Sequence, residues 1–222
     1  MAASSIIIGN QVLSLAAGLS FLAGFLINVF IVAVNISEWK KGRPVSTSDK
    51  VITSLGISRL IFQVSCLLML ILDGYFNRLS SLFVLLVMLT SDTSSIWFFT
   101  LLSVVFCLKI STLQNAFFLW LKIFVLNRVS HLIMASLMVS VSYALLFSLM
   151  TNLAIANNST QETNNNVYMG LHISVLIFPT TGPLLINFMS SVLLIIYLCD
   201  HMTRMRSESN RTSHLDTYYK TI

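Results

Sequence analysis

Long apolar runs dominate this sequence and constrain its fold more than any other feature. Only 9% of the 222 residues are charged and 56% are hydrophobic, whereas a soluble domain carries about 25% charged residues. A helix of roughly 20 apolar residues crosses the bilayer core. The sequence therefore predicts an all-α polytopic membrane helix bundle, with spans near residues 11–36, 51–73, 81–108, 131–152 and 171–199.

Lysine and arginine are distributed unevenly over the loops between these runs. Eleven of them fall on one side of the predicted membrane: Lys40, Lys41, Arg43, Lys50, Lys109, Lys122, Arg128, Arg204, Arg206, Arg211 and Lys220. The other side holds only Arg78, and Arg59 lies within the second run. Because basic loops stay in the cytoplasm, we expect the N-terminus outside and residues 200–222 inside. A segment at 113–126 is apolar but short, and Lys122 interrupts it, so we expect an amphipathic stretch at the inner interface.

Arg59 is the sharpest single feature, because a charge inside a span normally faces the bundle interior and has a partner. Asn28, in the first run, is expected at a similar depth, which predicts that the two side chains face each other. They would form either a structural polar clamp between the first two helices or a signalling switch.

The third run contains six consecutive polar residues, 90–95, followed by Ile96 and Trp97. Polar residues inside a span are costly unless they face a cavity or another helix. One helical face carries Thr90, Thr93, Trp97 and Leu101, and Asp92 lies on a neighbouring face with Ser95 and Phe99. These residues predict either a site for an amphipathic small molecule or ordinary polar packing beside an interfacial Trp. The counted depths place Asp92 and Arg59 in opposite halves of the membrane.

The loop after the fourth run carries two overlapping glycosylation sequons, at Asn157 and Asn158, and the predicted topology places them outside. Two other sequons, at Asn35 and Asn210, fall inside or within lipid and should stay unmodified. In the fifth run, Pro179, Gly182 and Pro183 predict a bend.

Signatures of enzymes are missing from the sequence. No His/Cys/Glu cluster has zinc-ligand spacing, no glycine-rich phosphate loop occurs, and the three cysteines do not suggest a disulfide framework. We therefore predict no catalytic residues, no metal, no cofactor and no nucleic-acid partner; the lipid bilayer is the expected surrounding.

Several short motifs, taken in order, resemble those of the type 2 (bitter) taste receptors. The first run ends Asn28-Val-Phe-Ile-Val-Ala-Val-Asn35, and the second contains Leu55-Gly-Ile-Ser-Arg59-Leu60. The third ends in Leu108-Lys-Ile110 and is followed by Phe118-Leu-Trp-Leu-Lys122. The resemblance covers nearly the whole chain.

This resemblance implies a G protein-coupled receptor of the plasma membrane that binds a small bitter compound in the outer half of its bundle. It makes Trp97 a ligand contact and places Leu101 where many members have Asn. It also implies that a gustducin-like heterotrimeric G protein contacts the inner loops, at Lys109, Lys122, Arg128 and Arg204.

The family has seven helices, whereas this sequence stops where the sixth would begin, so we expect a fragment or a truncated product containing the first five. The alternatives are a vomeronasal-type receptor and a five-helix transporter or scaffold. The Arg59 and Phe-Leu-Trp-Leu-Lys motifs argue against the former. The separate depths of Arg59 and Asp92 argue against a transporter, which would pair its intramembrane charges.

Overall fold

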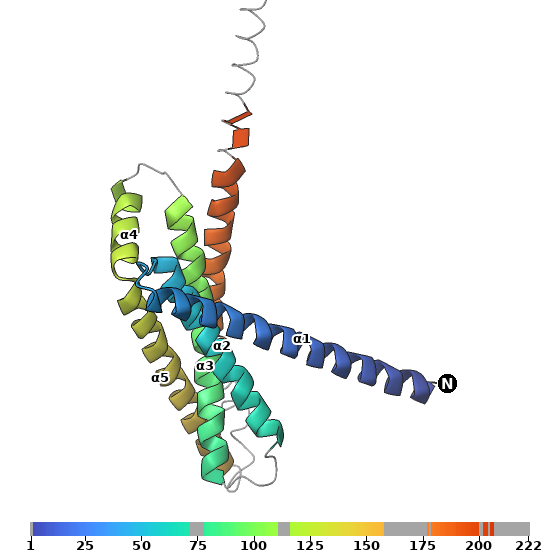
Figure 1. Ribbon diagram of the computed structural model, residues 1–222. Helices are drawn as coiled ribbons and strands as arrows, with labels where there is room; N and C mark the ends of the chain where they lie inside the picture. Colours follow the sequence, from blue (N-terminus) through green and yellow to red (C-terminus); the bar gives the residue numbers. More distant parts are fainter. Residues whose placement is uncertain are drawn as a thin grey trace, which may run out of the picture.

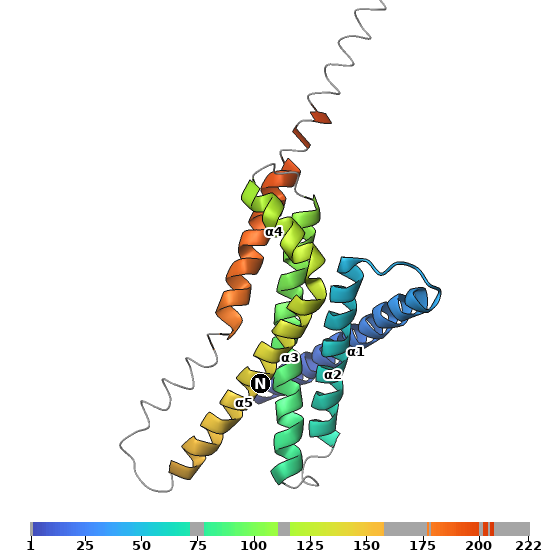
Figure 2. The ribbon, with the colours of Figure 1, turned by 90° about the vertical axis from the view of Figure 1, so that its left-hand side faces the viewer.

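The computed structural model describes residues 2–71, 78–110, 116–157, 177, 179–199, 202–203 and 205–206. Helices account for every regular element within these ranges (Figures 1 and 2). They are α1 (Ala2–Lys40), α2 (Thr47–Ile71), α3 (Arg78–Ile110), α4 (Ala116–Asn127) and α5 (Val129–Asn157). A further helix covers Pro179–Cys199.

Five of the described helices are long and apolar enough to cross a membrane. These spans are Gln11–Lys40, Thr47–Ile71, Ser80–Ile110, Val129–Asn152 and Pro179–Cys199. The 12 residues of α4 rise only about 18 Å at 1.5 Å per residue, too little for a bilayer core of about 30 Å. The predicted fold class, an all-α membrane bundle with five spans, is therefore confirmed.

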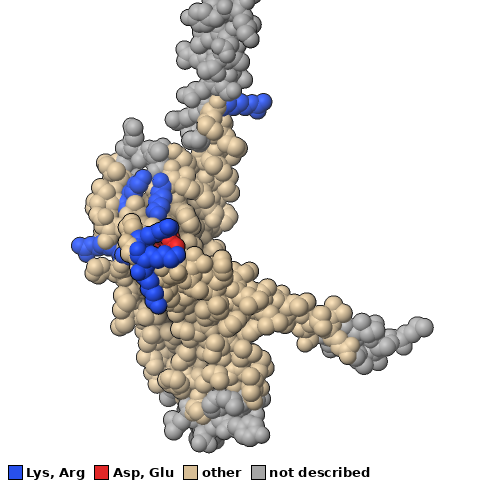
Figure 3. Space-filling view, in the orientation of Figure 1, with Lys and Arg blue, Asp and Glu red and all other residues tan. Residues whose placement is uncertain are grey.

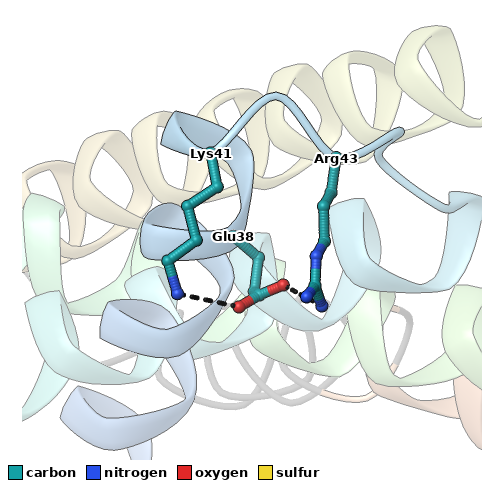
Figure 4. A network of polar contacts seen from close by, with 3 residues as sticks. All are labelled: Glu38, Lys41 and Arg43. Carbon is teal, nitrogen blue, oxygen red and sulfur yellow. Dashed lines mark hydrogen bonds and ion pairs between the residues drawn. The ribbon is translucent and has the colours of Figure 1, made fainter.

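α1 extends past the predicted apolar run 11–36 as far as Lys40, and polar contacts stabilise this end. The carboxylate of Glu38 pairs with Lys41 Nζ at 3.3 Å and with the Arg43 guanidinium (Figure 4). Gly42 follows with a φ of 77°, in the left-handed region that glycine adopts without steric cost. This turn ends the helix.

A reciprocal cap starts α2 at Thr47, four residues before the predicted run 51–73. The backbone N–H of Asp49 donates to Ser46 Oγ at 3.2 Å, and the backbone N–H of Ser46 donates to Asp49 Oδ2 at 3.3 Å. This is a capping box, which satisfies two amide donors at the helix start. Hydrophobicity alone could not locate this boundary.

The centre of the bundle is α3, which contacts α2, α4 and α5. Its middle section contains buried Ser and Thr residues, namely Ser91, Thr93, Ser94, Ser95 and Thr100. Each of these hydroxyls donates to the carbonyl four residues earlier in α3, so its donor is satisfied without water. Small side chains also let neighbouring helices approach closely.

A compact apolar cluster joins the start of α2 and the end of α3 to α4 and α5. Its buried members are Val51, Val105, Leu108, Val125 and Val129. The opposite face of α4 exposes Leu119, Trp120, Ile123 and Phe124, so this helix is apolar on both faces rather than clearly amphipathic. Arg128 forms the turn that leads directly into α5.

The first half of α1 runs away from the bundle, as Figure 1 shows. Residues 11–20 are all exposed, whereas the second half of α1 packs on α2. The close approach occurs at Gly56, where an added Cβ would lie 2.8 Å from Val32 Cγ2. A glycine at this position is therefore a packing requirement of the α1–α2 contact.

Candidate functional site

An open cavity of about 420 Å³ lies among α1, α2, α3 and the Pro179–Cys199 helix. We call it the interior cavity. Its lining combines aromatic rings with amides, hydroxyls and two opposite charges. The lining residues are Phe21, Gly24, Asn28, Arg59, Phe62, Gln63, Asp92, Ser95, Ile96, Phe99, Thr100, Leu184 and Asn187.

One face of α3 supplies the largest share of this lining. Asp92, Ser95, Ile96, Phe99 and Thr100 follow the spacing i, i+3, i+4, i+7, i+8, which defines one face of an α-helix. The sequence had placed Asp92, Ser95 and Phe99 on a common face. The structure adds that this face borders the cavity.

The charges of Arg59 and Asp92 line the same cavity, whereas the sequence placed them in opposite halves of the membrane. Arg59 is the thirteenth of the 25 residues of α2, and Asp92 is the fifteenth of the 33 residues of α3. Both therefore lie near the middle of their helices.

Asn28 also lines the interior cavity with Arg59, on the wall that α1 contributes. Within the described residues, no hydrogen bond joins the two side chains. Polar contacts between α1 and α2 occur at other positions instead. Asn35 Nδ2 donates to Thr53 Oγ1 at 2.9 Å, and Gln63 Nε2 donates to the carbonyl of Phe21 at 3.2 Å.

Three polar cavity residues were missed by the sequence analysis: Gln63, Thr100 and Asn187. Gln63 lies one turn after Arg59, and that spacing could have revealed it. Thr100 donates both to Ile96 O at 2.9 Å and to Pro183 O at 3.2 Å. The second bond joins α3 to the Pro179–Cys199 helix, at the proline where a bend was expected.

The other predicted ligand contacts, Thr90, Thr93, Trp97 and Leu101, do not line the interior cavity. Thr93 is buried, and Leu101 packs against the apolar cluster at the end of α3. Trp97 is half-buried, and its indole Nε1 is buried without a hydrogen-bond partner in the described chain. This face of α3 is therefore a packed one that retains an unpaired donor.

Basic residues predicted to contact a G protein lie near one end of the bundle. Lys109 Nζ donates to Ser48 Oγ at 2.7 Å, which joins the end of α3 to the first turn of α2. The Arg128 guanidinium lies 5.8 Å from the centroid of the Phe124 ring, and Lys122 is half-buried in α4. Figure 3 shows most of the visible lysines and arginines gathered over the end that carries the α1–α2 loop and α4.

Two predicted sites lie outside the described residues. Arg204, the fourth basic residue predicted to contact the G protein, lies outside them, as does the sequon at Asn158. Asn157, the other predicted glycosylation site, is the last residue of α5.

The family described as Taste receptor protein (TAS2R) has a model that matches residues 7–221, almost the whole chain. The chain belongs to this family. Taste receptor type 2 member 103 of Rattus norvegicus is 31% identical over 206 residues, covering 90% of this chain and 66% of the relative.

Primate relatives show the same pattern. Taste receptor type 2 member 4 is 29% identical over 196 residues in both Pan troglodytes and Homo sapiens, covering 84% of this chain. The chain matches 65% of the length of these relatives.

Membership of the bitter taste receptor family makes the chain part of a multi-pass membrane receptor, a class of proteins that are not enzymes. The family match therefore excludes the two alternatives, a vomeronasal-type receptor and a five-helix transporter or scaffold. The argument against a transporter from the depths of Arg59 and Asp92 no longer holds, since both line one cavity. The family match decides the class in its place.

Proposed function

We propose that this chain forms the first five helices of a bitter taste receptor that binds small bitter compounds and activates a gustducin-like G protein. Residues 1–199 contain the helices, and residues 200–222 belong to the third cytoplasmic loop. The receptor lies in the plasma membrane with its N-terminus outside the cell. The family match over residues 7–221 supports the receptor class.

The proposal of an outer ligand pocket is based on the Trp97 indole. Its buried Nε1–H has no acceptor in the described part of the chain, and an unpaired buried donor costs about 1–3 kcal/mol. A ligand oxygen or nitrogen would accept this bond while the ligand's apolar part packs on the ring. We assign Thr90, Thr93 and Leu101, which share its face of α3, as the neighbouring contacts. Asp92, expected in the same pocket, lines the interior cavity instead.

The G protein contact is assigned to the basic end of the bundle, at Lys109, Lys122, Arg128 and Arg204. Lys109 and Arg128 are exposed, and a cluster of positive charge steers an acidic partner surface toward it. A ligand acts by favouring the bundle state whose inner face binds the G protein.

The test uses a receptor that contains these 222 residues and is as long as its relatives. It is expressed in cells with a suitable G protein. Bitter compounds should release calcium, and Trp97→Ala should raise the EC50 at least about tenfold, equivalent to 1.4 kcal/mol of binding. Trp97→Phe keeps an aromatic ring and removes the donor, so it should lose sensitivity chiefly to compounds with an acceptor. Phe83→Ala, at a side chain 68% exposed on α3, is the control.

The proposal fails if a broad panel of bitter compounds evokes no calcium from a receptor that reaches the cell surface. The pocket assignment alone fails if Trp97→Ala and Phe83→Ala respond like the unchanged receptor.

A further inference from the structure

Two opposite charges line the interior cavity without pairing with each other. Arg59 comes from α2 and Asp92 from α3. Among the described residues, neither side chain has an ion pair or a hydrogen bond. A charged side chain within a membrane-spanning helix is costly and is normally paired. Because Arg59 and Asp92 do not pair with each other, the interior cavity offers a ligand one positive and one negative group.

The remaining lining suits a small amphipathic molecule. Asn28 and Asn187 add amides from α1 and the Pro179–Cys199 helix, which can donate and accept hydrogen bonds. Phe62 and Phe99 add aromatic surface to the same lining. The volume of about 420 Å³ lies within the range of small-molecule sites.

We propose that the interior cavity is a second ligand site, distinct from the outer pocket at Trp97, and that it binds small zwitterions with an apolar group. The ligand ammonium donates to the Asp92 carboxylate, and the ligand carboxylate accepts from the Arg59 guanidinium, which binds carboxylates through two parallel hydrogen bonds. The apolar group packs on Phe62 and Phe99. A neutral or singly charged ligand would leave at least one of the two intramembrane charges unpaired.

The experiment measures binding to the purified chain in lipid nanodiscs, with three probes that share a phenyl group. L-Phenylalanine carries both charges, 2-phenylethylamine only the positive one, and 3-phenylpropanoate only the negative one. We expect L-phenylalanine to bind at least about tenfold more tightly than either, because one charge-assisted hydrogen bond contributes about this factor. Equal binding of the three probes, or none, overturns the proposal without any variant.

Variants then assign each charge. Asp92→Asn should remove the advantage that the ammonium gives and leave 3-phenylpropanoate unaffected, and Arg59→Gln should do the reverse. Arg43→Gln, in the exposed α1–α2 loop, should change nothing. Asp92→Glu and Arg59→Lys keep the charge and serve where the first variants do not fold. A zwitterion preference that survives the loss of either charge contradicts the assignment.

This binding assay contains no G protein, so its outcome is separate from that of the proposed receptor activity. Zwitterion binding without calcium release would contradict the activity and leave the second site standing. Calcium release by bitter compounds without a preference for zwitterions would do the opposite.

Discussion

Intramembrane polar side chains in this protein fall into two groups with different roles. Most described hydroxyls of α3, such as those of Ser91 and Ser95, donate to their own helix, at 2.7 Å and 2.8 Å, and so add little directional attraction between helices. Thr100, which also donates to Pro183 O, is an exception. Amides reach across instead, as Asn35 does to Thr53 and Gln63 does to Phe21. The amides therefore fix how α1 sits on α2, while the hydroxyls allow close packing.

The Asn35–Thr53 contact should contribute measurably to stability. Asn35→Ala and Thr53→Ala should each destabilise the protein, and a double-mutant cycle should give a coupling of about 0.6 kcal/mol, as found for hydrogen bonds between membrane helices. Reversible unfolding in mixed micelles measures it. Ser20→Ala is the control, because that hydroxyl donates only to Ala16 O of its own helix. A coupling of zero would mean that this contact does not hold the helices together.

Glycine positions in two helices differ sharply in what surrounds them, which explains the geometry of the α1–α2 contact. Gly56 faces Val32 at a distance that leaves no room for a methyl group, whereas an added Cβ at Gly18 meets nothing within 4 Å. Val32 is β-branched and its χ1 is stiff, so it cannot easily move aside. The α1–α2 crossing therefore requires a residue without a side chain at position 56.

Gly56→Ala should destabilise the protein by about 1–3 kcal/mol, the usual cost of overpacking. Gly18→Ala should be neutral or slightly stabilising, because alanine is about 1 kcal/mol better than glycine in a helix. Thermal unfolding of the two variants in the same detergent gives the comparison. Adding Val32→Ala to Gly56→Ala should restore stability, and a failure to do so would place the strain elsewhere.

Sequence patterns predicted the helices better than the face that each helix presents. The five apolar runs could be recognised because a membrane-spanning helix needs roughly 20 apolar residues. Helix ends depended on local caps, such as Ser46 with Asp49. In α3 polar residues occupy several faces, so periodicity could not distinguish the Asp92 face from the Trp97 face. Arg59 and Asn28 could be assigned to one interior space because each is a rare polar group in its span.

At the scale of the whole molecule, charge is divided between two places. Most described lysines and arginines on the face shown in Figure 3 gather at one end of the bundle, while Arg59 and Asp92 line the interior cavity. The first arrangement favours a cytoplasmic position for that end. The second adds two charges to a bundle whose buried polar side chains, among the described residues, are Ser and Thr.

Glycosylation reports the orientation of the whole chain. With the N-terminus outside, the sequons at Asn157 and Asn158 are exposed to the glycosylation machinery. An Asn157→Gln/Asn158→Gln double variant should lose the mobility shift that glycosidase treatment produces, and Asn35→Gln should retain it. If the mobility shift persists in the double variant and disappears in Asn210→Gln, the topology is the reverse of the one proposed.

The face of α3 that borders the interior cavity decides which residues form the candidate site. Single cysteines, placed in a chain whose native Cys66, Cys107 and Cys199 are replaced by serine, can be tested with a hydrophilic thiol reagent. We expect fast reaction at Asp92→Cys, Ser95→Cys and Phe99→Cys, which line the cavity, and slow reaction at Ser94→Cys, Phe98→Cys and Val105→Cys, which are buried in the bundle. The reverse pattern would show that the face of α3 with Ser94 and Phe98 borders the open space, and it would contradict the site described above.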